Sequence, residues 1–146
     1  MRGALTAALP LAILLAVPAA AGGPGAQVIE HKGRWESGYG VEWYNVVGRL
    51  KNTSGHPLAY VKLRIDALDK AGKTVASTDA YNESAEVLTV EVEGGPKDPA
   101  ERLKTTKVKP LAPDAEERFR GSFIKDETPA FTDYRVTVVD TPAAAP

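Results

Sequence analysis

The chain has 146 residues, a length that suits one globular domain with a single hydrophobic core. Hydrophobic residues make up 43% of it and charged residues 25%, which are the proportions of a folded protein and exclude a chain disordered throughout. The formal net charge is -1, and basic residues are interleaved with acidic ones, which excludes the concentrated basic surface that nucleic-acid binding requires.

The N-terminus, up to Ala21, has the pattern of a secretory signal peptide. Arg2 supplies a positive start, residues 4–17 are almost entirely apolar, and Ala19 and Ala21 form an A-x-A-type cleavage site. An uncleaved membrane span is the alternative, but the apolar run is shorter than the ~20 residues that a span needs and contains Pro10. We therefore expect a secreted or periplasmic protein without a stable membrane anchor after cleavage.

The chain contains no cysteine, which excludes disulfides, a lipid on an N-terminal cysteine, and thiolates for zinc, iron–sulfur clusters or catalysis. Its only histidines, His31 and His56, stand outside any catalytic or metal-binding motif. The spacing of the carboxylates does not favour a glycosidase. We therefore expect no enzyme, no cofactor and no metal.

Residues 22–27 are rich in Gly, Pro and Ala and predict a flexible leader, followed by a short first strand at 28–32. The next stretch, 33–44, concentrates glycines and aromatic residues. One interpretation is an exposed aromatic surface of Trp35, Tyr39 and Trp43 that stacks on sugars, peptides or a partner protein. The alternative, which we favour, is that Trp43 or Tyr44 fills the core while the glycines form a turn.

Two runs of alternating hydrophobicity form the centre of the chain. The first, ending at Asn52, places Tyr44, Val46, Gly48, Leu50 and Asn52 on an inward face, and the second, 60–68, does the same with Val61, Leu63, Ile65 and Ala67. Lys62, Arg64 and Asp66 are expected to face water. A turn at 69–72 leads to a more polar strand at 74–81. The pattern predicts an all-β, immunoglobulin-like antiparallel sandwich.

Three segments resemble the FxLYD domain, an immunoglobulin-like module of secreted and envelope-associated prokaryotic proteins. They are Val46-x-Gly48-x-Leu50-x-Asn52, Ile65-Asp66-Ala67-Leu68-Asp69-x-x-Gly72, and Leu111-x-Pro113-Asp114 followed by Phe119. Ile65, Ala67 and Leu68 replace letters of the name motif, and Asp114 stands where the family has Gly. The resemblance implies one domain over residues 28–140 without a catalytic site.

Residues 82–109 are longer than the connection expected there, and predict an extra hairpin or a long loop. Val87 to Glu93 alternates like a strand, Asp98 to Glu101 has the signature of one capped helical turn, and 103–109 is expected to be extended. This insertion either binds a specific partner or is a loop without a binding role. Asp79, Asn82, Glu83 and Glu86 are oxygen ligands suited to Ca²⁺, although a solvated acidic turn is the interpretation we favour.

The remaining strands are predicted at 117–124, with Phe119 and Phe123 inward, and at 131–139, followed by a disordered tail at 141–146. We expect a non-enzymatic binding or structural module of the cell envelope. Its predicted partner is another envelope or extracellular protein. The alternative is a carbohydrate-binding module that uses Trp35, Tyr39 and Trp43.

Overall fold

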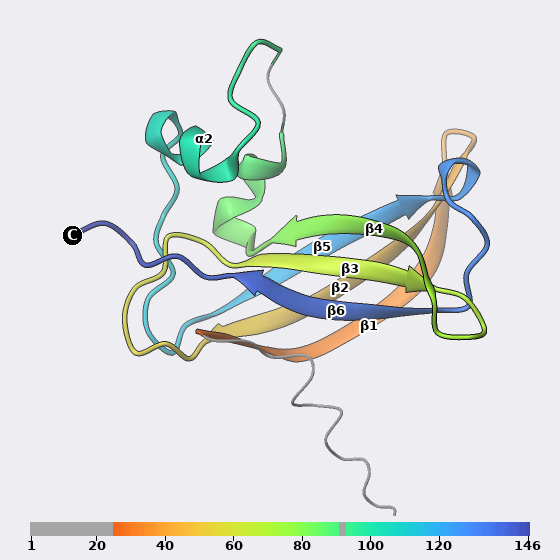
Figure 1. Ribbon diagram of the computed structural model, residues 1–146, viewed down its shortest axis with the longest axis horizontal. Coiled ribbons are helices and arrows are strands. Elements are labelled where there is room, and N and C mark those ends of the chain that lie inside the picture. The colour runs from red at the N-terminus through yellow and green to blue at the C-terminus, as the bar shows by residue number, and fades with distance from the viewer. Residues whose placement is uncertain (1–24, 91–92) are drawn as a thin grey trace, which may run out of the picture.

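The computed structural model describes residues 25–90 and 93–146, which form a two-layer antiparallel β-sandwich (Figure 1). One sheet has the order β1-β2-β5, from strands β1 (Ala26–Gly38), β2 (Val41–Asn52) and β5 (Glu116–Ile124). The other has the order β4-β3-β6, from β3 (Lys62–Leu68), β4 (Thr74–Tyr81) and β6 (Asp133–Asp140). The predicted all-β sandwich is confirmed, whereas the predicted signal peptide and the start of the leader lie outside the described residues.

The connections between strands follow the immunoglobulin plan. The chain changes sheets after β2, after β4 and after β5. In an immunoglobulin domain strands A, B and E share one sheet, strands C and F share the other, and C′ lies beside C. Strands β1, β2 and β5 correspond to immunoglobulin strands A, B and E, and strands β3, β4 and β6 correspond to C, C′ and F.

The core between the sheets is made by the inward residues of the alternating runs. It comprises Val46, Leu50, Val61, Leu63, Ile65, Ala67, Phe119, Phe123, Val136 and Val138, together with residues of β1 and of the connecting loops. Every inward side chain predicted for the second run is completely buried, because successive side chains of a strand point to opposite faces.

Asp66 differs from the prediction, because it is only 3% exposed rather than facing water. Its carboxylate accepts hydrogen bonds from Ser77 Oγ and from Arg135 Nη2, the latter at 3.0 Å, and Arg64 lies 3.6 Å away. Burial raises the pKa of Asp66, but these hydrogen bonds and positive charges outweigh it and hold the pKa below its usual value. The buried charge is therefore compensated.

The N-terminal predictions need two corrections. The predicted leader ends early, since Ala26 and Gln27 already belong to β1 and Ala26 is buried. The predicted short strand at 28–32 is part of a strand that continues to Gly38, and the stretch expected to form a turn is mostly strand. Only Tyr39 and Gly40 separate β1 from β2. Antiparallel pairing with β2, interrupted by one register shift between Val28 and Glu30, extends β1 beyond the limits that its hydrophobic pattern shows.

The 82–109 insertion is a long loop with two short helices and not the alternative hairpin. Residues 83–89 form the 3-10 helix η2 (Glu83–Thr89), so the predicted strand from Val87 is wrong; Glu91 and Val92 lie outside the described residues. The predicted capped turn is confirmed in α2 (Pro99–Thr105), where the Asp98 side chain accepts a hydrogen bond from the Ala100 amide. The expected extended segment from Leu103 is helical at its start.

This insertion packs on its own apolar cluster at one end of the sandwich (Figure 1). Ala59, Tyr60, Tyr81, Ala85 and Leu88 are its buried members. A further 3-10 helix, η3 (Lys125–Glu127), follows β5. Within the described residues, no helix is long and apolar enough to span a membrane.

The expected disordered tail is also corrected. The Ala59 amide donates to the Pro142 carbonyl at 2.8 Å, and the Ala144 amide donates to the Pro57 carbonyl at 3.0 Å. Ala143 forms an isolated bridge with Leu58. The chain beyond β6 is therefore held by backbone hydrogen bonds as far as Ala144.

Candidate functional site

The β1–β2 hairpin ends in a two-residue loop, Tyr39-Gly40, at the end of the sandwich opposite the insertion (Figure 1). Both residues have positive φ, +52° at Tyr39 and +78° at Gly40. A two-residue hairpin loop of type I′ requires this conformation at both positions, because it matches the twist of the flanking strands. Glycine adopts it freely, whereas tyrosine adopts it at a cost in free energy.

Four large apolar side chains are exposed at and near this hairpin. Tyr39 has a relative accessibility of 106%, and Trp35 one of 50%. Val41, at the start of β2, and Ile124, at the end of β5, are also exposed. We call Trp35, Tyr39, Val41 and Ile124 the hairpin tip.

Trp35 is held in place although it is half exposed. Its ring lies 5.6 Å from the Phe131 ring at an interplanar angle of 31°, and 5.2 Å from the Tyr44 ring in an edge-to-face arrangement. The Lys125 ammonium lies 5.9 Å from the Trp35 ring centroid, and the same ammonium donates to Glu42 at 2.6 Å. The aromatic contacts and the cation–π contact together fix the indole.

The aromatic layer beneath Trp35 links the two sheets. Tyr44 also contacts Tyr134 of β6, and Tyr134 hydrogen-bonds to His31 with 2.6 Å between Oη and Nδ1. Burial raises the pKa of Tyr134 to about 12, with the nearby Tyr44 and Asp133 adding to the effect. The phenol therefore stays neutral at physiological pH.

The three candidate residues from the sequence do not form one aromatic surface. Trp35 pairs with Tyr44 across the β1–β2 ladder, while Trp43 pairs with Glu36, the next residue of β1. Adjacent residues of a strand point to opposite faces, so Trp43 lies on the other face of the sheet from Trp35. Tyr39 is at the turn between them. The interpretation that Trp43 or Tyr44 fills the core holds only for Tyr44, which packs against the core. Trp43 is half-buried on the outer face of the sheet.

Sequence reasoning missed the contributions of Val41, Ile124, Phe131 and Lys125 to this region. Phe131 and Lys125 belong to the connection between β5 and β6, far from the hairpin in sequence. The sequence signal for this hairpin is the Tyr39-Gly40 pair between the two strands. The signal is weak, because the first position of such a loop is normally Asn, Asp or Gly and not tyrosine.

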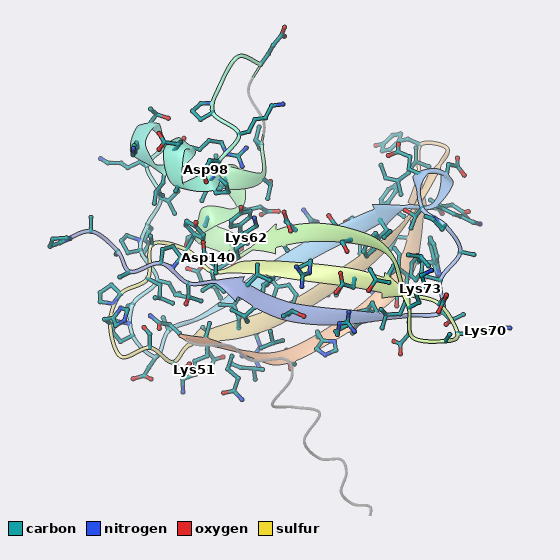
Figure 2. All side chains as sticks on the ribbon, viewed as in Figure 1. Lys51, Lys62, Lys70, Lys73, Asp98 and Asp140 are labelled. Atoms are coloured by element: carbon teal, nitrogen blue, oxygen red, sulfur yellow. The ribbon has the colours of Figure 1, made fainter. Side chains whose placement is uncertain are left out.

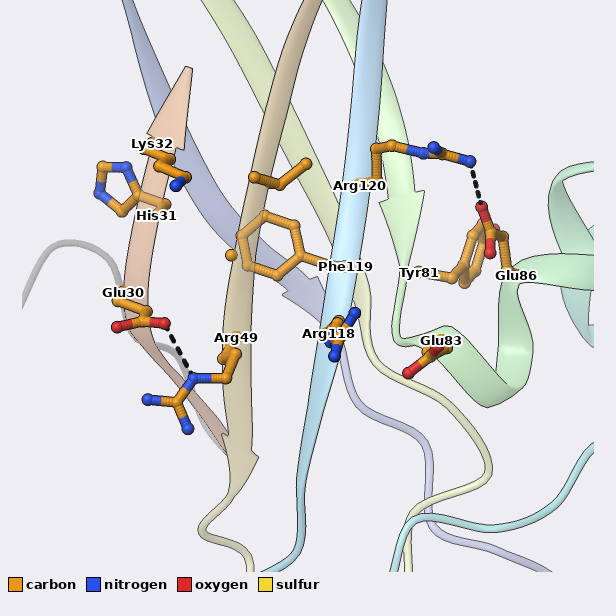
Figure 3. Close-up of a pocket in the computed structure, with 12 residues that line it drawn as sticks. Glu30, His31, Lys32, Arg49, Tyr81, Glu83, Glu86, Arg118, Phe119 and Arg120 are labelled. Atoms are coloured by element: carbon orange, nitrogen blue, oxygen red, sulfur yellow. Dashed lines mark hydrogen bonds and ion pairs between the residues drawn. The ribbon is translucent and has the colours of Figure 1, made fainter. Parts of the chain in front are cut away.

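A second feature is an open hollow of about 780 Å³ on the outer face of the β1-β2-β5 sheet (Figure 3). Its cationic lining residues are Lys32, Arg49, Arg118 and Arg120. Glu30 borders it on β1, and Glu83 and Glu86 of η2 border it beyond β5. Val47 and Gly48 of β2, the middle strand of the sheet, also line it.

Three of the four suggested oxygen ligands for Ca²⁺ have other partners. Asn82 is buried, with Oδ1 accepting from the Val61 amide and Nδ2 donating to Glu117, while Glu86 lies 3.6 Å from Arg120 and Asp79 lies 3.6 Å from Lys62. In the part of the chain that the structure describes, no group of three His, Asp or Glu side chains is placed to hold a metal ion.

Comparison of the chain with protein-family models, with curated proteins and with solved structures returned no match.

Proposed function

We propose that the protein is a non-enzymatic, FxLYD-type module of the cell envelope, secreted or periplasmic, which binds another envelope or extracellular protein through its hairpin tip. The signal-peptide pattern predicted for the first 21 residues supports the compartment. Two turn positions support the family: Gly72 has φ +82°, and Asp114, which stands where the family has Gly, has φ +63°. Asp is among the few other residues that tolerate this conformation.

The observation that carries the proposal is the position of Tyr39. A left-handed backbone disfavours tyrosine by about 1 kcal/mol or more, and the side chain recovers nothing by burial because it is fully exposed. Asn or Gly at the same position would give a more stable loop. A tyrosine that stabilises neither the turn nor the core is suited to contact another molecule, and tyrosine is enriched in protein interfaces.

The surroundings of Tyr39 favour a protein over a carbohydrate. Tyr39 has an open ring, but the ring of its neighbour Trp35 does not add a second open face for stacking on a sugar, because it is packed against Phe131 and has Lys125 over it. Trp43 cannot complete a platform from the opposite face of the sheet. Tyr39 lies at the turn, with Trp35 near it on one face of the sheet and Val41 and Ile124 on the other. These exposed aromatic and apolar side chains are of the kind that anchors protein interfaces.

Site-specific photo-crosslinking in cells that export the full chain tests the proposal. A benzophenone amino acid at position 39 should give a discrete adduct of higher mass, and the same amino acid at Lys70, on the β3–β4 turn (Figure 2), should not. Purified wild-type protein in excess should compete for the adduct, and Y39N should not. The proposal fails if Y39N competes as well as wild type or if position 39 gives no adduct, and competition by glycan fragments would favour the carbohydrate-binding alternative.

A further inference from the structure

The outer hollow of the β1-β2-β5 sheet shares no lining residue with the hairpin tip, and its charges follow the strand register. Two cross-strand rows run through it. In one row Glu30, Arg49 and Arg118 lie side by side, and in the next row Lys32 and Arg120 lie on either side of Val47. Four cationic side chains thus gather on one sheet face of a chain whose net charge is -1.

These cations are only partly neutralised within the molecule. Arg49 pairs with Glu30 at 2.9 Å and with Glu116, and Arg120 lies 3.6 Å from Glu86. In residues 25–90 and 93–146, the side chains of Lys32 and Arg118 have no carboxylate within ion-pair distance. Arg118 also lies directly opposite Arg49, and like charges at opposed cross-strand positions are destabilising. The arrangement therefore leaves positive charge available to an external anion.

The acidic side chains at the borders narrow the choice of ligand. Glu30 lies on β1, in the row of Arg49 and Arg118 and two residues before Lys32, while Glu83 and Glu86 lie on the η2 side, beyond β5 (Figure 3). A uniformly anionic polymer that crosses the strands would be repelled at both borders. A peptide with acidic residues in its centre and basic residues at both ends is complementary to Glu30, to the cations, and to the pair Glu83 and Glu86.

We propose that this hollow is a second binding surface, which takes an extended acidic segment of a protein, flanked by basic residues and lying across β1, β2 and β5. Arg118 and Lys32 supply positive charges that have no ion pair within the described protein. Arg49 and Arg120 give up part of their ion pairing with the protein's own carboxylates in order to pair with the ligand. The volume of about 780 Å³ lies in the range of pockets for small ligands, so it accepts a few side chains and not a folded domain.

Calorimetric titration of the full exported chain tests this surface. The probes are a synthetic peptide with a central run of Asp and Glu flanked by Lys, and a peptide of equal composition with Lys in the centre and acids at the ends. The first should bind saturably and more weakly as salt is raised from low to physiological concentration. The second should bind at least about fivefold more weakly, because its charges oppose those of the hollow.

Charge-removing variants locate the binding. R118Q and K32Q should each weaken the acidic-centre peptide about two- to fivefold, and the double variant about tenfold, as expected for exposed charge pairs. K70Q removes one charge from the β3–β4 turn of the other sheet (Figure 2) and should change the affinity by less than about 1.5-fold. The proposal is overturned if the peptide does not bind, if K70Q weakens it as much as R118Q, or if both peptides bind equally. Tighter binding of polygalacturonate would overturn the assignment to a protein segment.

Discussion

Asn52 shows how a single buried polar residue organises a loop in this fold. Its Nδ2 donates to the carbonyls of His56, Leu111 and Ala112 at 2.8 to 3.1 Å, and its Oδ1 accepts from Ser54. The side chain is completely buried, so these hydrogen bonds replace water that it has lost. A residue that both donates and accepts is needed here, since an unpaired buried carbonyl costs about 1 to 3 kcal/mol.

Tyr39 is the residue at which stability and the proposed binding role oppose each other. We expect Y39N to raise the free energy of unfolding by about 0.5 to 1 kcal/mol, because Asn adopts a left-handed backbone more easily than Tyr. Urea denaturation of wild type and Y39N measures the difference. A destabilised Y39N would mean that the tyrosine contributes to folding, which would remove the main support for a binding role.

Gly48 is a residue where any side chain would collide with the core. A Cβ there would meet the Glu30 carbonyl, and it would lie 2.7 and 2.8 Å from two ring atoms of Phe119. We expect G48A to lower the free energy of unfolding by about 1 to 3 kcal/mol, the usual cost of overpacking. G38A is the matched control in the same sheet, because a Cβ there meets only Trp43 at 3.4 Å. Equal stability of G48A and G38A in denaturant would contradict the close packing of Phe119 over Gly48.

At the scale of elements, one carboxylate joins the insertion to the sandwich. Glu117 of β5 accepts hydrogen bonds from Asn82 Nδ2 and the Ser84 amide, each at 2.9 Å, and from Ser84 Oγ at 2.6 Å. Burial raises the pKa of Glu117, but these hydrogen bonds and the charge of Lys109 outweigh it and hold the pKa below its usual value. The start of η2 is thereby attached to β5.

The lowered pKa of Glu117 predicts a pH-dependent attachment. The pKa of Glu117 is lower in the folded state than in the unfolded state, where it is about 4.3. The charged carboxylate therefore stabilises the fold fully above this unfolded-state pKa, and the stabilisation is lost as the pH falls through the folded-state pKa. The difference in unfolding free energy between wild type and E117Q should therefore be larger at about pH 7 than at about pH 3. Urea titrations at both values measure it. A difference that is the same at both pH values would show that the charge of Glu117 does not stabilise the fold.

At the scale of the whole molecule, the described residues form two apolar clusters, and the chain has no cysteine for a covalent cross-link. The main cluster lies between the sheets, and the second joins Tyr60 and Tyr81 to Ala85 and Leu88 of η2. Tyr60 also donates a hydrogen bond to Asp140 at 3.0 Å. Because the second cluster is small, the insertion should open at a lower free energy than the sandwich.

Leu88 and Val87 provide a matched test of this arrangement. Leu88 is 1% exposed in the second cluster and its neighbour Val87 is 47% exposed. L88A should remove about 2 to 4 kcal/mol of local stability, and V87A should change it by less than about 0.5 kcal/mol. Hydrogen exchange should then show lost protection in η2 and α2 of L88A, with β2 and β3 amides much less affected. Equal loss of protection in β2 and β3 would show that insertion and sandwich unfold as one unit.

The sequence by itself determined the strands that bury one face, because alternation of apolar and polar residues is a local property. Leu63 and Ile65, or Phe119 and Phe123, are inward for this reason, and the Asp69 to Gly72 turn and the Asp98 cap follow from equally local chemistry. The lack of cysteine likewise excludes thiol chemistry on composition alone.

Only the tertiary structure decided the features that depend on partners distant in sequence. The first three residues of the alternating run, 87–89, are helical, because Leu88 packs on Tyr60 and Tyr81 instead of joining a sheet. Asp66 is buried because Arg135 lies on a strand some seventy positions away. The separation of Trp35 from Trp43, the exposure of Tyr39 and the gathering of cations around Val47 likewise follow from strand register and sheet order, which local patterns do not specify.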